Sequence, residues 1–339
     1  MDTFPLPRRL HNAAGRVRTL GIELEFAGLE IADIDGIIVE LYGGRPEPVS
    51  RFEHKIVDTC LGRFTVEIDL ALLKERSYLK LLDFLGVELA PDSLRQAEDA
   101  LARLAATLVP HEIASPPLPM TEAHRLERLR ERLQAAQALG TKAAMYYAFG
   151  LQFNPEAPAL QAGTILAYLR AFLLLADWLE QRAQIALARR LSPFINGFHQ
   201  PYIRAVLDPD YAPDLARLID DYIAANPTRN RPLDLLPLFA HLDPERVARG
   251  LDDAKVKINP RPTFHYRLPN SLIDDPDWTL AREWAGWVAV DDLAQDPTKI
   301  RRMSIDYLEQ RSLLAVGYDE QWAARVAQEW LSDQNQASA

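Results

Sequence analysis

Two glutamates, Glu23 and Glu25, lie in the strictly alternating stretch Gly21–Phe26. Successive side chains of a β-strand point to opposite faces, so the apolar residues of this stretch share one face and the two glutamates share the other. Their carboxylates then lie about 7 Å apart and repel each other unless a cation lies between them. Taken alone, the stretch also fits the solvated outer face of an antiparallel sheet.

Three later stretches repeat this design, with apolar residues on one face and chemically active side chains on the other. The four polar sets are Glu23 and Glu25; Thr65, Glu67 and Asp69; Gln152 and Asn154; and Arg261, Thr263, His265 and Arg267. Carboxylates come from the early strands, whereas amide, imidazole and guanidinium groups come from the late ones. If the four strands share a sheet, this face is a concave polar floor with acids at one side and arginines at the other.

The chemistry that such a floor predicts is that of a nucleotide–metal site. Carboxylates are ligands for Mg²⁺, which in phosphoryl-transfer sites also binds substrate phosphates. Arginine makes bidentate phosphate contacts and stabilises the charge that develops there. The chain contains neither GxxxxGK[ST] nor GxGxxG, so phosphate would be bound without a glycine-rich loop.

Composition excludes several other classes of protein. A net charge of −10 gives no general attraction to nucleic acid or to an anionic membrane. One cysteine, Cys60, excludes an intramolecular disulfide framework, and we see no secretory signal. The most apolar segment, residues 162–179, is interrupted by Arg170 and Asp177 and is expected to be too polar for a membrane span. The seven histidines lack HExxH spacing. We therefore expect a cytoplasmic protein without nucleic-acid or membrane partners.

Hydrophobic periodicity predicts strands interspersed with helices. Strands are expected over 18–26, 30–40, 64–69, 145–154 and 255–268, with an extended piece over 110–119. Helices are expected over 91–108, 121–139, 160–191 (two patterns), 208–225, 233–242, 278–293, 300–314 and 318–331.

Strands with one polar face are typical of an antiparallel sheet rather than a parallel one. We predict an α+β fold: one catalytic domain over residues 1–331, with an antiparallel sheet that has one polar concave face, a helix-rich C-terminal half and a polar tail over 332–339.

Five stretches in order resemble the amidoligase family, relatives of glutamine synthetase and glutamate–cysteine ligase that join a carboxylate to an amine with ATP. The stretches are GIELEF, FTVEIDLALLK, HEIASPPL, FGLQFN and RPTFHYRLPN, within about residues 18–290. The resemblance implies a fold like that of those ligases. It also implies ATP and Mg²⁺ as cofactors, with Mn²⁺ as an alternative.

The resemblance also assigns roles to individual residues. Glu23 and Glu25 match the family's metal-binding acids on the first strand, and Glu112 matches a further metal ligand in the E-x-x-S-P segment, which includes Ser115. Asp69 matches the acid of the second motif. Arg267 matches an arginine that contacts ATP phosphates or the acyl phosphate.

The chain departs from the family pattern at two places. Gln152-Phe153-Asn154 stands where the family has H-x-H, and His265 stands where it has a glutamate before the arginine. Amide oxygens can bind Mg²⁺ but add no charge, and a neutral histidine suits Zn²⁺ or Mn²⁺ better. His265 could act as a general base or as a hydrogen-bonded structural residue.

The leading hypothesis is an ATP- and Mg²⁺-dependent ligase that forms an amide or γ-glutamyl-type bond through an acyl phosphate. Arg261 and Arg231 would neutralise phosphates with Arg267; the loop over 229–231 could instead pair with the acidic helix over 214–221. Asp69, Gln152, Asn154 and His265 would form the substrate side. The partners would be small-molecule or peptide carboxylates and amines, with homo-oligomers possible. Alternatives are a non-catalytic nucleotide-binding relative and a metal-dependent amide hydrolase.

Overall fold

The computed structural model describes residues 4–68, 110–141, 149–183, 196–251, 258–313 and 318–331. These residues form an α+β structure built on a nine-stranded antiparallel sheet, as the alternation of apolar and polar residues predicts. Three features that the sequence predicts lie outside the described residues. They are the candidate catalytic residue Asp69, the helix over 91–108 and the polar tail over 332–339.

The sheet has the strand order β2-β3-β4-β5-β1-β7-β9-β8, and β6 pairs with β1 beside this path. The strands are β1 (Thr19–Phe26), β2 (Arg45–Ser50), β3 (Glu53–Thr59), β4 (Gly62–Ile68), β5 (His111–Ala114), β6 (Leu118–Pro119), β7 (Leu151–Pro155), β8 (Leu233–Asp234) and β9 (His265–Tyr266). The glutamate-bearing strand β1 is therefore central, between β5 and β7.

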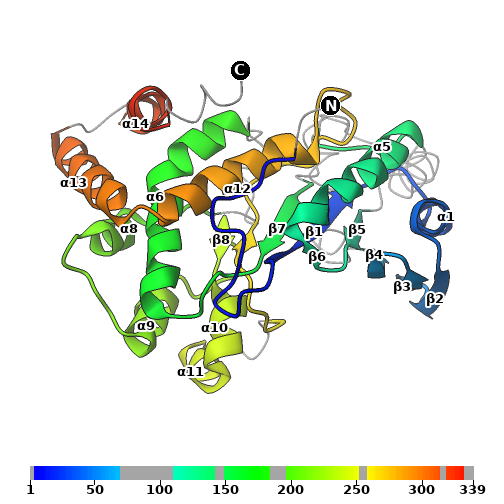
Figure 1. Ribbon diagram of the computed structural model, residues 1–339, viewed down its shortest axis with the longest axis horizontal. Helices are drawn as coiled ribbons and strands as arrows, with labels where there is room; N and C mark the ends of the chain where they lie inside the picture. Colours follow the sequence, from blue (N-terminus) through cyan, green and yellow to red (C-terminus); the bar gives the residue numbers. More distant parts are fainter. Residues whose placement is uncertain are drawn as a thin grey trace, which may run out of the picture.

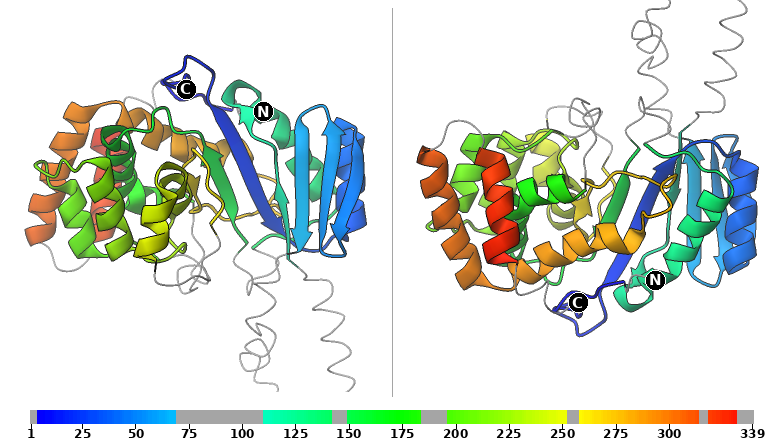
Figure 2. Two further views of the ribbon diagram at one scale, coloured as in Figure 1. Left: turned by 90° about the horizontal axis from the view of Figure 1, so that it is seen from below. Right: turned by 90° about the horizontal axis from the view of Figure 1, so that it is seen from above.

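Within the described ranges, ten α-helices accompany the sheet. They are α1 (Ile31–Tyr42), α5 (Glu127–Ala135), α6 (Ala162–Arg182), α8 (Gln200–Leu207), α9 (Leu215–Ala225), α10 (Leu236–Leu242), α11 (Pro244–Gly250), α12 (Leu280–Ala294), α13 (Pro297–Leu313) and α14 (Tyr318–Arg325). A 3₁₀ segment, Met120–Leu126, precedes α5, and a π segment, Val326–Trp330, follows α14. Helices α1, α5 and α12 cover one face of the sheet, whereas most of the others gather beyond its β8 end (Figures 1 and 2).

The apolar face of the sheet packs against α12. Phe153 of β7 lies with its ring centroid 5.4 Å from that of Trp284, and Tyr266 of β9 lies 5.3 Å from Trp287. These aromatic pairs bury large apolar areas. The opposite face of β1, β5 and β7 is visible in the left view of Figure 2 with no described helix in front of it. The polar alternates of these strands therefore lie on the face of the sheet opposite α12.

Two predicted strands are wrong, for different physical reasons. Residues 30–40 form helix α1, because Ile34, Ile37 and Ile38 follow the helical period and are buried on one side. Residues 255–257 of the strand predicted over 255–268 lie outside the described residues. Over 258–268 the strand is reduced to the two residues of β9, since Pro260 and Pro262 precede it and lack the N–H that a central strand must donate.

Several helix boundaries also differ from the prediction. The helix predicted to start at Asp208 starts at Leu215, after Pro213, and is capped by Asp214, which accepts a hydrogen bond from Arg217 N. In the segment 233–242, Leu233–Asp234 pairs with β9 and the helix begins only at Leu236.

A buried ion pair anchors the start of β1 to α12. Arg18 Nη2 lies 2.7 Å from Asp291 Oδ2, and both side chains are fully buried. Arg18 also donates to the main-chain oxygens of Arg9 and Glu156. This set of contacts fixes the strand that carries Glu23 and Glu25 against the helical layer.

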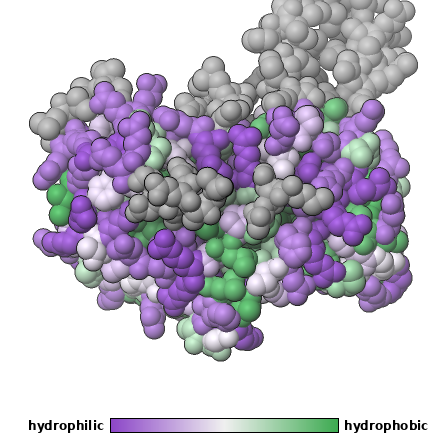
Figure 3. Space-filling model, turned by 45° about the horizontal axis from the view of Figure 1, so that its top comes forward, coloured by the Kyte–Doolittle hydropathy of each residue, from purple (hydrophilic) through white to green (hydrophobic). Residues whose placement is uncertain are grey.

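Helix α6 is the one described helix that is long and apolar enough to cross a membrane, judged by length and composition alone. Ten of its residues are buried, and it packs against α12, α13 and α14. Core packing therefore accounts for its apolar character. Figure 3 shows a mostly hydrophilic molecular face, with apolar side chains gathered near its middle.

Candidate active site

Four glutamates form a row across four neighbouring strands. Glu53 of β3 is paired with Glu67 of β4, Glu67 with Glu112 of β5, and Glu112 with Glu25 of β1. Residues paired across antiparallel strands point to the same face, and like charges directly opposite each other are destabilising. This acid row (Glu53, Glu67, Glu112 and Glu25) therefore concentrates carboxylates on the face of the sheet opposite α12, where Lys55 Nζ lies 3.6 Å from Glu53 Oε1.

The carboxylate of Glu25 is held in place by two donors. Its Oε2 accepts a hydrogen bond of 2.6 Å from Gly150 N, and its Oε1 accepts one of 2.6 Å from Gln152 Nε2. Gln152, which stands at the first histidine of the family's H-x-H pattern, thus orients an acid through its amide nitrogen.

Glu23 precedes Glu25 by two residues in β1 and has different hydrogen-bond partners. Asn154 Nδ2 donates to its Oε1 at 3.0 Å, and Arg261 Nη2 lies 3.3 Å from the same oxygen. The two glutamates of the first motif therefore differ in environment, since Glu25 belongs to the acid row and Glu23 is paired with a guanidinium.

His265 is buried beneath this pair and is neutral. Burial, together with the charges of Arg261, Arg267 and Arg229, lowers the pKa of His265 well below its usual value. Its Nδ1 lies 2.8 Å from Asn154 Oδ1, which also accepts from Arg261 Nη2 at 2.7 Å. Arg261 Nη2, which can only donate, also lies 2.9 Å from the same Nδ1, so this ring nitrogen contacts both an acceptor and a donor. This arrangement favours an orienting role for His265 over general-base catalysis.

Three arginines, Arg261, Arg267 and Arg229, are close enough to His265 to lower its pKa. The buried carboxylate of Asp234 lies among the same residues. Arg229 Nε lies 3.0 Å from Asp234 Oδ2, and Asp234 is the cross-strand neighbour of His265. Arg267 Nη1 donates to the main-chain oxygen of Arg229 at 2.5 Å. Burial raises the pKa of Asp234, and Arg229 opposes that shift. The sequence analysis missed Asp234, because its position in a strand only two residues long leaves no periodic signal.

Two residues that the sequence analysis assigns to nucleotide binding, Arg231 and Ser115, make hydrogen bonds within the protein. Arg231 is buried and donates from Nη1 to the main-chain oxygens of Asn196 and Gly197 at 3.1 and 2.6 Å, so Arg229, not Arg231, is the loop arginine that reaches the site. Ser115 Oγ accepts from Ile22 N at 2.9 Å and extends the β1–β5 ladder.

A cavity of about 570 Å³ opens on this face beside Glu23. Its polar lining comprises Asn12, Arg16, Thr19, Glu23, Ser115, Asn154, Glu156, Arg261 and Thr263. It lies toward the N-terminal half of β1, at the side of Glu23 away from Glu25. The sequence analysis did not identify Glu156, whose carboxylate accepts from Asn12 Nδ2 at 2.7 Å and from Thr19 N at 3.0 Å.

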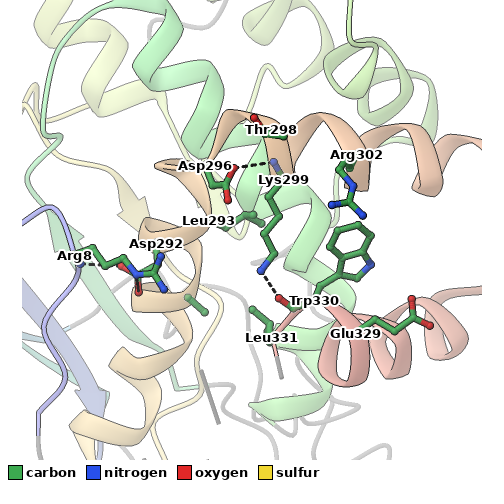
Figure 4. Close-up of a pocket in the computed structure, with 11 residues that line it drawn as sticks. Arg8, Asp292, Leu293, Asp296, Thr298, Lys299, Arg302, Glu329, Trp330 and Leu331 are labelled. Atoms are coloured by element: carbon green, nitrogen blue, oxygen red, sulfur yellow. Dashed lines mark hydrogen bonds and ion pairs between the residues drawn. The ribbon is translucent and has the colours of Figure 1, made fainter. Parts of the chain in front are cut away.

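A second cavity, of about 410 Å³, lies among the C-terminal helices (Figure 4). Lys299 reaches across it and donates from Nζ to the main-chain oxygen of Trp330. The guanidinium of Arg302 lies 5.6 Å from the centre of the Trp330 ring. These contacts join α13 to the π segment Val326–Trp330. We assign this cavity no part in the reaction proposed below.

A family model described as "putative amidoligase enzyme" matches residues 16–289. The chain belongs to the amidoligase family. The match contains the acid row, His265 and the three arginines around it. Membership makes this amidoligase an enzyme of the ligase type that forms amides. Comparison with curated proteins and with solved structures found no significant match.

The donor set of this amidoligase fits a divalent metal of the magnesium type. Within the described ranges, no three His, Cys, Asp or Glu side chains converge closely enough to hold an ion by themselves. Mg²⁺ usually binds through one or two carboxylates while the substrate phosphates and waters complete its shell. The opposed pair Glu25 and Glu112 supplies that number of carboxylates.

Proposed function

We propose that this amidoligase is an ATP- and Mg²⁺-dependent carboxylate–amine ligase that forms an amide or γ-glutamyl-type bond through an acyl phosphate. The observation that carries the proposal is the shared face of the acid row and the arginines around His265. Carboxylates suit the metal of a nucleotide, and guanidinium groups suit its phosphates. Both kinds of group are on the same face of one sheet.

The residues then divide into a metal side and a phosphate side. Glu25 and Glu112 would hold Mg²⁺, which when bound neutralises phosphate charge. Arg267 and Arg229 would bind the transferred phosphate from the side of β9, whereas Arg261 belongs with Glu23 to the substrate side. Glu23, whose carboxylate is paired with Arg261, is assigned to the substrate side in our scheme, although the family pattern makes it a metal ligand.

The reaction has two steps. First, an oxygen of the substrate carboxylate bonds to the γ-phosphorus of ATP, and the bond from that phosphorus to the β–γ bridging oxygen breaks to release ADP. Second, the amine nitrogen bonds to the carbonyl carbon, and the carbon–oxygen bond to phosphate breaks with its electron pair. The proton lost by the nitrogen leaves with inorganic phosphate. The arginines stabilise the negative charge that develops on the phosphoryl group in both steps.

The test is ADP release from wild type and Glu25→Gln with a panel of carboxylates and amines, and amide products identified by mass spectrometry. The proposal predicts ADP release that needs Mg²⁺, a carboxylate and an amine together, and its loss in Glu25→Gln. Amide hydrolysis without ATP would contradict the proposal and favour a metal-dependent hydrolase. ATP binding without ADP release for any pair would favour a non-catalytic relative.

A further inference from the structure

The cavity beside Glu23 is much larger than ammonia requires. Its volume of about 570 Å³ compares with about 30 Å³ for one molecule of liquid water. Along β1 it extends from Glu23 to Thr19, four residues or about 13 Å. A site of this size and shape accommodates an amino acid or a short peptide.

Two buried donors of the cavity lining have no hydrogen-bond partner. They are Arg261 Nε and Thr263 Oγ1, and both residues line the cavity. Buried polar groups are nearly always hydrogen-bonded in native structures. These two atoms have almost no accessible surface, so a rotation of their side chains toward the cavity would bring them to the acceptors of a ligand. Arg16, an exposed guanidinium, lines the same space. A carboxylate is the acceptor that matches two guanidinium groups and a hydroxyl.

Acids line the same cavity and balance these cations. Glu23 and Glu156 both face it, and each retains acceptor capacity because an ionised carboxylate has about four lone-pair sites. Glu23 Oε1 and Arg261 Nη2 are only 3.3 Å apart, so a negative and a positive group are presented side by side. An α-amino acid offers the complementary pair, with its ammonium and carboxylate groups a few ångströms apart.

We propose that this cavity binds the amine substrate of the ligation, and that this substrate is an α-amino acid or the zwitterionic end of a short peptide. The inference rests on the proposed function. The amino group lies at Glu23, the end of the cavity nearest the acid row, and the carboxylate lies at Arg261 and Thr263. A polyamine or ammonia would leave Arg16 and Arg261 without the carboxylate that an amino acid supplies.

The test is calorimetric binding to the full chain of a panel comprising the standard amino acids, dipeptides, putrescine and ammonium chloride. For each compound that binds, its methyl ester and its N-acetyl derivative are titrated as well. We expect at least one amino acid or dipeptide to bind. Loss of the carboxylate charge or of the amino group should weaken binding at least tenfold, since charge-assisted hydrogen bonds are lost.

The variants place the binding in this cavity. Thr263→Val removes a hydroxyl that has no partner in the protein, so the fold should be kept while affinity falls about tenfold. Arg16→Gln should act in the same direction. The matched controls are Ser304→Ala, which removes a buried unpartnered hydroxyl in α13, and Arg204→Gln, an exposed arginine of α8. Both controls should bind like wild type.

The inference is overturned if no amino acid or dipeptide binds, if an ester or N-acetyl derivative binds as well as its parent, or if Thr263→Val and the controls are equivalent. Binding of putrescine or ammonium that Thr263→Val abolishes would also overturn it. Mg²⁺-ATP binding, measured separately, keeps the two claims apart. If amino acids bind but Mg²⁺-ATP does not, the ligase proposal is contradicted, while the assignment of the cavity as an amino-acid site is retained.

Discussion

Glu25 of β1 and Glu112 of β5 lie directly opposite each other in the antiparallel register, with Glu67 of β4 next in line. Two carboxylates in this arrangement oppose folding when both are charged, because like charges directly opposite each other destabilise a sheet. A protein can tolerate that cost where a cation is to be bound. The pair is therefore the feature from which the metal assignment follows.

Glu25→Gln should separate metal affinity from stability. Without metal, the free energy of unfolding of the variant should differ from that of wild type by at most about 1 kcal/mol, since removal of one like charge offsets loss of one of the two hydrogen bonds that Glu25 accepts. Its affinity for Mn²⁺, measured by electron paramagnetic resonance as a probe for Mg²⁺, should fall at least tenfold. Glu23→Gln serves as the comparison: our assignment predicts a much smaller loss. An equal or larger loss in Glu23→Gln would restore Glu23 as the principal ligand.

Arg267→Lys should change nucleotide affinity, whereas Arg231→Lys should change the stability of the fold. Arg267→Lys should weaken Mg²⁺-ATP at least tenfold, because lysine cannot reproduce a bidentate phosphate contact. Arg231→Lys should lower the free energy of unfolding by about 1–3 kcal/mol, since main-chain acceptors lose buried donors, while nucleotide affinity stays unchanged. Calorimetric titration and urea denaturation measure the two effects. Weaker ATP binding in Arg231→Lys alone would reverse the two assignments.

The pKa of His265 predicts a pH dependence of stability. Because its folded pKa lies well below 6.5, the unfolded chain binds a proton that the folded protein does not, and stability falls as pH drops through 6.5 toward the folded pKa. The cost is about 1.4 kcal/mol per pH unit in that window. His265→Gln should reduce this slope in urea denaturation between pH 7.5 and 5.5. Parallel stability curves for the two proteins would show that His265 is not held neutral.

The buried pair Arg18–Asp291 should be a major determinant of stability. Asp291→Ala leaves the Arg18 guanidinium buried without its counter-ion, which typically costs about 3–5 kcal/mol. The exposed pair Arg132–Glu40 provides the control, and Glu40→Ala should cost at most about 1 kcal/mol. Urea denaturation measures both, and equal losses would contradict the anchoring role of Asp291 at β1.

The polar face could be predicted from sequence because its strands alternate strongly. Glu23, Glu25, Gln152 and Asn154 emerged on the expected face, since each lies between apolar residues that must be buried. The sequence could not predict which glutamates oppose each other, because register depends on pairing between strands far apart in the chain. The complete acid row, with Glu53 included, is visible only once that register is known.

Other features depend on tertiary contacts that leave no local pattern. Arg229 and Arg231 are two residues apart in the same loop. Arg229 pairs with Asp234 beside His265, whereas Arg231 donates hydrogen bonds to main-chain carbonyl groups. Residues 30–40 form a helix although the sequence predicts a strand, because Ile31, Ile37 and Val39 also satisfy the two-residue period of a strand. Short apolar stretches of this kind fit either period.

The most direct test of the central claim is thermal unfolding of wild type and Glu25→Gln with ATP and Mg²⁺, with ATP and a chelator, and with Mg²⁺ alone. A ligand at about 100 times its dissociation constant stabilises the folded state by about 2.7 kcal/mol, a shift in melting temperature that is readily measured. The account predicts a clear rise for wild type only when ATP and Mg²⁺ are both present, and its loss in Glu25→Gln. An equal rise in Glu25→Gln, or a rise with Mg²⁺ alone that ATP does not increase, would contradict it.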